Sequence, residues 1–140
     1  TGVRLLEQYI RDNPRVDIEL LPPVSFNDNM TVLSDCDVAL VSLAPGMNGL
    51  AVPSKAYFSL AAGKPILAIM DFESEISMAV TEHNLGWCCE PGNPESLASI
   101  IDEICLNNVG NNFTNPRDKF IKCYNDKILL PKFQSVINRL

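Results

Sequence analysis

The stretch from Gly49 to Met70 constrains the fold more than any other part of the chain, because it predicts a loop, a short helix, a tight turn and a buried strand in succession. Pro53 suits the first helical position, where its missing N–H group would have no partner in any case. Gly63 suits the left-handed position after the last helical residue, and Pro65 prevents the helix from continuing. Ile66 to Met70 is a continuous apolar run, typical of a strand covered on both faces. The stretch therefore predicts a helix packed on a parallel sheet.

The start of this helix has the chemistry of an anion site. Ser54 and Lys55 fall in its first turn, where unbonded N–H groups and the positive end of the helix dipole attract anions. Lys55 adds a mobile ammonium at the same place. Gly46 and Gly49, in the preceding loop, would let the backbone approach a ligand closely. Phosphate is the natural ligand for such a site, and the alternative is a capped helix with a solvated lysine.

Strands and helices are expected to alternate along the rest of the chain, which predicts an α/β fold with a parallel sheet. The 37–43 strand is expected to be central because of its apolar content. Leu130-Pro131 is expected to end the helix that starts at Pro116. Ligands of such sheets lie outside the carboxyl ends of the strands, where the loops 22–29, 44–53, 71–74 and 90–93 are expected. The expected strands are 16–21, 37–43, 66–70 and 87–89. The expected helices are 2–12, a turn or two near 29–33, about 53–62, 75–83, 94–105, 116–127 and a last turn or two in 132–140. An exposed Asn-rich loop is expected at 107–115.

Composition narrows the class of protein. The 140 residues suffice for one domain with a core, and 46% of them are apolar, so the chain is expected to be globular. A net charge of −6 without any basic run argues against a nucleic-acid partner. No apolar segment approaches the roughly 20 residues that span a membrane. Because the first residue is Thr1, we expect a fragment or a processed chain.

The five cysteines are not spaced like a zinc site or a paired disulfide framework. Cys88 and Cys89 are adjacent, so in a strand they would point to opposite faces. With His83 as the single histidine, a metal site is not expected. Buried free thiols in a reducing cytosol are the expected state, which predicts a cytoplasmic protein. Two matches to the glycosylation sequon, at Asn29 and Asn112, are therefore not taken as glycosylation sites.

Two segments carry a resemblance to a known family. The sequence VPSKAYFSLAAGKPILAIMDFESEI, followed by LGWCCEPGNPESLASII, resembles the C-terminal nucleotide-sugar-binding domain of GT-B glycosyltransferases of the family 4 type. The subgroup that it resembles has a Pro-Ser-Lys signature and occurs among enzymes of bacterial surface-polysaccharide synthesis. The resemblance covers roughly residues 1–105, and its most specific part is the pairing of Pro-Ser-Lys at 53–55 with Ala-Ala-Gly-Lys-Pro at 61–65.

The resemblance implies a single, partial Rossmann-like domain over residues 1–140, with C-terminal helices from about 116 to 140. Family domains hold about six parallel strands, and the start at Thr1-Gly2 is similar to the point just after the second strand. The first strands would thus be absent, together with most of the Arg and Lys that stabilise the leaving diphosphate and with the N-terminal acceptor domain. The implied activity is that of a retaining enzyme that moves a sugar from a UDP- or GDP-sugar to a saccharide or lipid-linked acceptor, without a cofactor, in the cytoplasm or at the inner face of the membrane.

The resemblance also assigns candidate residues. Gly49, Ser54 and Lys55 would bind the donor diphosphate, and Gly46 and Glu75 would be further donor contacts, Glu75 through a Ser-Glu-Ile pattern. Family enzymes usually carry two glutamates around this helix, but Leu50 and Phe58 occupy those positions here. The ribose contact and the catalytic residues are therefore unassigned.

Other residues favour structural explanations, and Ser74 and Asn93 are expected to cap the helices that follow them. Glu73 and Glu75 suit a polar turn and a helix start better than paired-carboxylate hydrolysis, and His83 suits a helix end better than a catalytic base. Two further hypotheses about the function of the whole chain stay open. One is a non-catalytic docking module, which would show a broad apolar patch where the first strands should lie. The other is a nucleotide-sugar epimerase, which would need additional acids and a histidine in the crevice.

Overall fold

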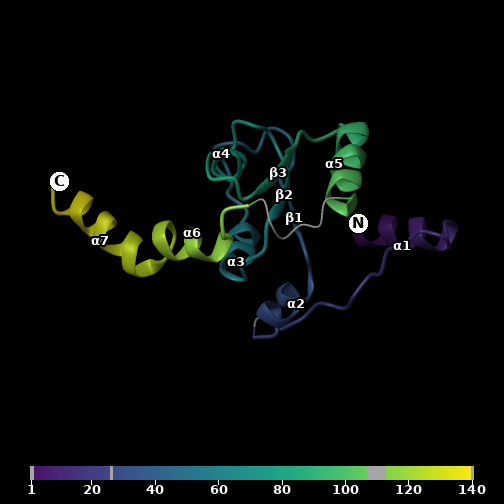
Figure 1. The fold of residues 1–140 in the computed structure, drawn as a ribbon, viewed down its shortest axis with the longest axis horizontal. Coiled ribbons are helices and arrows are strands. Elements are labelled where there is room, and N and C mark those ends of the chain that lie inside the picture. Colours follow the sequence, from purple (N-terminus) through teal and green to yellow (C-terminus); the bar gives the residue numbers. More distant parts are fainter. Residues whose placement is uncertain (1, 26, 107–112, 140) are drawn as a thin grey trace.

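The computed structural model describes residues 2–25, 27–106 and 113–139, and it has an α/β architecture built on a small parallel sheet (Figure 1). The strands lie in the order β1-β2-β3. In chain order the elements are α1 (Gly2–Asp12), α2 (Asn29–Asp35), β1 (Ala39–Ser42), α3 (Lys55–Ala61), β2 (Ile66–Ile69), α4 (Glu75–Glu82), β3 (Gly86–Cys89), α5 (Pro94–Leu106), α6 (Pro116–Cys123) and α7 (Asp126–Ile137). The architecture is that of a Rossmann-like fragment, as predicted.

The sheet is parallel throughout the described strands, and its register is continuous. Ala39 pairs with Ile66, and Ile66 pairs in turn with Gly86. At the other end Ser42, Ile69 and Cys89 lie side by side across the three strands. The crossovers β1–α3–β2 and β2–α4–β3 place α3 and α4 together on one face, whereas α5 lies on the opposite side of the sheet (Figure 1).

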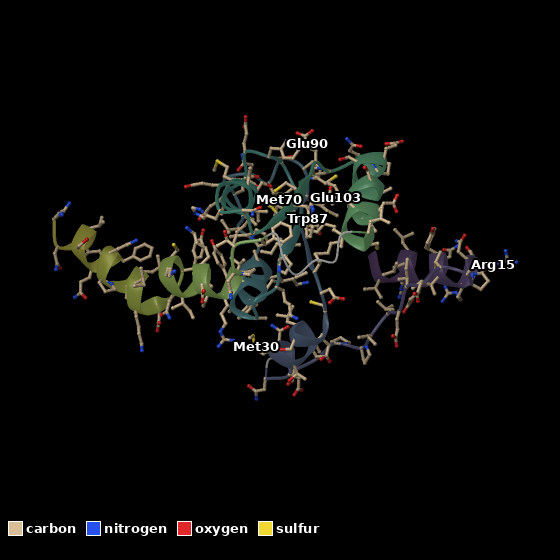
Figure 2. The ribbon with its side chains drawn as sticks, viewed as in Figure 1. Arg15, Met30, Met70, Trp87, Glu90 and Glu103 are labelled. Atoms are coloured by element: carbon tan, nitrogen blue, oxygen red, sulfur yellow. The ribbon has the colours of Figure 1, made fainter. Side chains whose placement is uncertain are left out.

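The core lies between the sheet and the layer of α3 and α4. Ile66, Ala68 and Met70 point from β2 and its end into this layer because alternate residues of a strand face the same side. They meet Leu60 of α3 and further buried residues of α4. The complete buried cluster is Val41, Ala56, Leu60, Ile66, Ala68, Met70, Ile76, Val80 and Leu85. Figure 2 shows Met70 and Trp87 in the middle of the molecule, with Arg15 and Met30 at its periphery.

The turn between α3 and β2 has the geometry that the sequence predicts. Gly63 has a φ of +78°, and its amide donates to the carbonyl of Leu60 at 2.9 Å. The amide of Lys64 reaches back to the carbonyl of Ser59 at 3.0 Å. These two bonds form a Schellman motif, which satisfies carbonyls at the end of α3. The motif directs the chain from α3 straight into β2.

Caps fix the starts of the later helices. The side chain of Ser74 accepts a hydrogen bond from the amide of Ser77 at the start of α4, and that of Asn93 accepts one from Ser96 at the start of α5. Asn115 accepts bonds from the amides of Arg117 and Asp118 at the start of α6. The caps predicted at Ser74 and Asn93 are therefore confirmed.

Helix α6 packs against α3, and α7 extends away from the sheet (Figure 1). A Cβ built on Gly63 would lie 3.7 Å from the Cβ of Arg117, so the start of α6 lies beside the end of α3. The end of α6 lies beside the start of α3, where the rings of Tyr57 and Tyr124 meet. The two helices are therefore antiparallel.

The strand predicted at residues 16–21 is wrong. The segment forms no strand, and its residues from Asp17 onward are exposed. An isolated extended segment cannot satisfy its backbone N–H and C=O groups, so it becomes a strand only beside a partner. The neighbour that a strand at this position would need is not among the described strands.

Strand β1 is an edge strand in the described sheet, not a central one as predicted. It pairs with β2 alone, and Leu40 is 56% exposed on the face away from α3. One face of β1 is therefore uncovered, although the apolar content of the strand predicts a central position. The central strand is β2, whose first three residues are buried.

The predicted boundary between the last two helices is also wrong. The break falls at Tyr124 and Asn125, and α7 continues through Pro131 to Ile137. The side chain of Asn125 accepts a hydrogen bond from the amide of Lys127, which starts a new helix earlier than expected. Pro131 is tolerated inside α7, at the cost of one backbone hydrogen bond.

The five cysteines are free thiols. Cys88 and Cys89 point to opposite faces of β3, as predicted, because the Sγ of Cys88 contacts the carbonyl of Ser77 in α4 and that of Cys89 contacts the carbonyl of Asn93 before α5. The expectation that the thiols are buried holds for Cys89 but not for Cys105, which is exposed. Most of the Asn-rich loop predicted at 107–115 lies outside the described residues. Across the described chain, no helix combines the length and the apolar character that a bilayer crossing requires.

Candidate functional site

The carboxyl ends of the three strands meet at one edge of the sheet. Because Ser42, Ile69 and Cys89 are in register, the loops 43–54, 70–74 and 90–93 all leave from this edge. Each loop leads to the start of a helix, so the first turns of α3, α4 and α5 follow the same edge. Helix starts at the carboxyl ends of parallel strands are where ligands of such sheets bind.

Ser54 and Lys55 stand at the start of α3, which differs in detail from the prediction. The helix begins at Lys55 with Ser54 before it, so Pro53 precedes the helix instead of occupying its first position. The amide of Ala56 donates to the carbonyl of Pro53 at 3.1 Å, so a tight turn leads into the helix. The boundary shifts by two residues, but Ser54 and Lys55 still lie at the helix start.

Several polar groups at this helix start have no hydrogen-bond or ion-pair partner among the described residues. The Ser54 side chain makes no capping hydrogen bond, and the structure shows none for the amides of Ser54 and Lys55 within its described part. Within the same residues the Lys55 ammonium has no ion-pair partner. Ser54 and Lys55 are exposed, so these groups are open to solvent and have the chemistry to engage an anion.

Gly46 and Gly49 shape the loop that precedes Ser54. Their φ values are +75° and +74°, a left-handed conformation that other residues rarely adopt. A Cβ on either glycine would meet no atom within 4 Å, so both backbones are accessible. In the structure the glycines serve the turns of this loop, in which the amides of Leu50 and Ala51 donate to the carbonyl of Met47.

A groove of about 540 Å³ opens beside Ser54 and Lys55. It runs along the unpaired side of β1, between α2 and α3, and most of its lining is apolar. Phe58, at the position of the family's second glutamate, lines it, whereas Leu50, at the position of the first, is 77% exposed. The lining residues are Asn29, Val32, Leu33, Cys36, Val38, Ala39, Leu40, Ser54, Lys55, Phe58 and Ser59.

Glu75 lies at the start of α4, and its side chain is exposed. Burial raises the pKa of Tyr57, and the negative charge of Glu75 raises it further. The rings of Tyr57 and Tyr124 lie 5.3 Å apart between centroids, tilted by 58°. Burial also raises the pKa of Tyr124, and the charge of Glu75 contributes. Glu75 therefore belongs to a cluster with Tyr57 and Tyr124.

Sequence reasoning missed the role of this cluster. Tyr57 lies within the motif stretch, but no local signal links it to Tyr124, 67 positions later in the chain. Only the antiparallel packing of α6 on α3 brings them together. A tyrosine two residues after the candidate lysine was the available hint.

Other candidates fall outside the site. His83 ends α4, with its Nδ1 3.9 Å from the Glu82 carboxylate, so it lies at a helix end as predicted. Glu73 is exposed in the turn before α4. The described residues contain no group of three or more His, Cys, Asp or Glu arranged to hold a metal ion.

Comparison with known proteins gives one informative similarity. The chain is 48% identical over 108 residues to the Pseudomonas aeruginosa protein named "Probable glycosyltransferase WbjE". The match covers 77% of this chain but only 27% of the relative, so the chain spans about a quarter of that protein's length. No protein-family profile matches the chain. No solved structure matches it either.

Proposed function

We propose that the chain is the donor-binding half of a glycosyltransferase. Its 48% identity to a named glycosyltransferase supports this class of enzyme. The match covers most of the chain, so it applies to the region that holds the candidate site. The parallel sheet with helix starts at its carboxyl edge is the kind of framework on which nucleotides bind.

The observation that carries the proposal is the group of hydrogen-bond donors without partners at the start of α3. Two backbone amides, the Ser54 hydroxyl and the Lys55 ammonium lie together, and none of them has a partner within the described residues. A nucleotide-sugar diphosphate has the charge and the acceptor oxygens to engage them. In this proposal Gly49 lets the loop approach the same phosphates, and Gly46 and Glu75 are outer contacts.

In the reaction, the bond between the sugar and the diphosphate breaks, a glycosidic bond forms to the oxygen of an acceptor hydroxyl, and the proton of that hydroxyl is released with the diphosphate. Negative charge develops on the leaving diphosphate, and the start of α3 with Lys55 would stabilise it electrostatically. Following the resemblance, we propose a UDP- or GDP-sugar donor, retention of configuration at the sugar, and a saccharide or lipid-linked acceptor. The acceptor would be held by a separate N-terminal domain, in the cytoplasm or at the inner face of the membrane.

Because both domains would supply the reaction geometry, the 140-residue chain alone should not transfer sugar. Turnover by this chain would contradict the two-domain part of the proposal. The central test is a thermal-shift panel on the full-length protein with UDP, GDP, UDP-glucose and GDP-mannose. A rise in the unfolding midpoint with one nucleotide class is expected, since a ligand that binds only the folded state stabilises it. No rise with any of the four would contradict donor binding.

One observation favours a second candidate, a non-catalytic docking module of the same fold. The unpaired side of β1 and the exposed Leu40 border the mainly apolar groove, so an uncovered apolar surface lies where the first strands were expected. A docking module would bind a protein partner and no nucleotide. The thermal-shift panel separates the two candidates.

A further inference from the structure

Helix α7 carries an apolar stripe that the described fold leaves uncovered. The helix extends from the end of α6 away from the sheet, and none of its residues, all of which the structure describes, is buried (Figure 1). Residues three, four and seven positions apart share one side of a helix. Five apolar residues follow this spacing and form the stripe: Leu129, Leu130, Phe133, Val136 and Ile137. All but Leu129 are exposed, and the exposed fractions of Phe133 and Ile137 are 65% and 66%.

Basic residues border this stripe on both sides. Because successive residues of a helix are about 100° apart around its axis, Lys127 lies beyond the edge that Leu130 marks. By the same geometry Lys132 lies beyond the opposite edge, which Val136 marks. Both lysines are exposed, and their long stems can keep the ammonium groups at a charged surface while the stripe beside them is buried. The acid of α7, Asp126, stands at the first helical position, where the helix dipole favours it.

Charge is divided unevenly between this end of the chain and the rest. Residues 116–140 contain six lysines and arginines and two aspartates, which gives a net charge of +4. Residues 1–115 contain five lysines and arginines and fifteen aspartates and glutamates, which gives a net charge of −10. An anionic surface would therefore attract α6 and α7 and repel the remainder of the chain, so a single orientation satisfies both parts.

The charges also argue against a second copy of the chain as the occupant of the stripe. In a two-fold dimer the same patch lies on both sides of the interface, so two basic α7 helices would lie side by side. Two segments with a net charge of −10 would be brought together as well. A bilayer with anionic headgroups offers instead an apolar interior for the stripe and negative charge for the lysines that border it.

We propose that α7 lies on the surface of an anionic phospholipid bilayer, with Phe133 and Ile137 inserted among the lipids and with Lys127 and Lys132 at the headgroups. The inference goes beyond the proposed function, because it concerns a surface other than the start of α3 and needs no donor. A helix of 12 residues with one apolar stripe would bind reversibly. If the acceptor is lipid-linked, as proposed above, this contact holds the enzyme on the bilayer that carries the acceptor.

The test is a vesicle co-sedimentation titration of the full-length protein, without nucleotide sugar. The anionic vesicles contain phosphatidylethanolamine and phosphatidylglycerol at about two to one, and phosphatidylcholine vesicles are the uncharged comparison. The protein should bind the anionic vesicles and not the uncharged ones, and added salt should weaken the binding because it screens the lysines. Ile137→Ser should weaken binding about tenfold or more, since it removes apolar surface from the stripe. Lys132→Gln should weaken it about fivefold.

Each variant has a matched control in the same chain. Ile128 is an exposed isoleucine of α7 that lies outside the stripe, so Ile128→Ser should bind vesicles as the wild type does. Arg15 is an exposed cation near the other end of the chain, so Arg15→Gln removes one positive charge without affecting binding. Unfolding midpoints measured in parallel identify any variant whose fold is lost, and Phe133→Ser is a second stripe variant in case Ile137→Ser is one of them.

Three outcomes would overturn the inference. The first is a full-length protein that does not bind anionic vesicles, since another part of the protein would then cover the stripe. The second is an equal effect of Ile137→Ser and Ile128→Ser on vesicle binding. The third is a dimer, detected by light scattering, that Ile137→Ser dissociates, because the occupant would then be a second copy. Vesicle binding by a protein that binds no nucleotide would support this inference and contradict the proposed function, so the two fail separately.

Discussion

Gly86 packs its α-carbon directly against the backbone of Ile66, its partner in the neighbouring strand. A Cβ built on Gly86 would lie 2.0 Å from the carbonyl oxygen of Ile66 and 2.7 Å from its nitrogen. The φ of Gly86 is +149°, which L-residues rarely adopt. Because Ile66 is fully buried at the start of the central strand, neither backbone can move without disturbing the core.

Gly86→Ala should therefore destabilise the chain by about 3 kcal/mol or more, because the new methyl group clashes with buried backbone rather than with a flexible side chain. Urea unfolding monitored by circular dichroism measures the loss. Gly92→Ala is the matched control: Gly92 has a φ of +80°, but its Cβ would meet nothing within 4 Å. Gly92→Ala should lower the free energy of unfolding by only about 1 kcal/mol, the cost of backbone strain without a steric clash. Equal losses in the two variants would contradict the close approach of β3 to β2.

Lys55→Ala in the full-length protein should weaken binding of the nucleotide-sugar donor about tenfold or more, or about 1.4 kcal/mol. The physical reason is that the Lys55 ammonium has no partner within the described residues and stands beside unbonded amides. Titration calorimetry with the responsive nucleotide measures the change. Lys122→Ala, on the exposed side of α6, should leave affinity unchanged. An unaltered dissociation constant in Lys55→Ala would remove Lys55 from the site.

The half-buried Tyr57 and Tyr124 should make stability fall at alkaline pH. The pKa values of Tyr57 and Tyr124 are raised in the folded state, chiefly because burial disfavours the phenolate. The unfolded chain therefore loses these protons first, so their contribution is complete below about pH 10 and is lost as the pH rises through the higher folded pKa. The Tyr57→Phe/Tyr124→Phe double variant should lose less of its unfolding midpoint between about pH 9 and 11 than the wild type. Tyr9→Phe should follow the wild type, and an identical decline in the double variant would refute the prediction.

The cap of α5 should contribute measurably to stability. The Asn93 side-chain oxygen accepts a hydrogen bond of 3.0 Å from the amide of Ser96. Asn93→Ala removes this bond and should cost about 1 kcal/mol, whereas Asn93→Asp should retain most of it. Thermal unfolding of both variants tests the cap. A loss as large in Asn93→Asp as in Asn93→Ala would show that the bond is not what stabilises the helix start.

Sequence reasoning succeeded wherever structure is decided within a few residues. The Schellman turn at Gly63 and Lys64 and the caps at Ser74 and Asn93 depend on φ preferences and short-range hydrogen bonds, and the structure confirms all three. The same local logic placed Ser54 and Lys55 at a helix start. It misjudged the break near Pro131, because Asn125 offered an earlier cap and the exposed helix α7 tolerates the proline.

Sequence reasoning failed wherever the outcome depends on a distant partner. An extended segment such as 16–21 and an apolar strand such as β1 carry the same local signals whether or not a neighbour pairs with them. The exposed residues at 17–21 and the free side of β1 could be seen only in the assembled sheet. The Tyr57–Glu75–Tyr124 cluster was equally invisible, because it joins three elements.

By itself, the sequence determined that this chain alternates helices with parallel strands and places a lysine at the start of α3, since backbone preferences, caps and apolar runs act over single turns. The tertiary structure alone decided which strand is central, which apolar faces are left uncovered, and that Tyr124, directly after α6, packs against Tyr57 of α3. Burial and pairing are properties of residues far apart in the chain, so no local pattern specifies them.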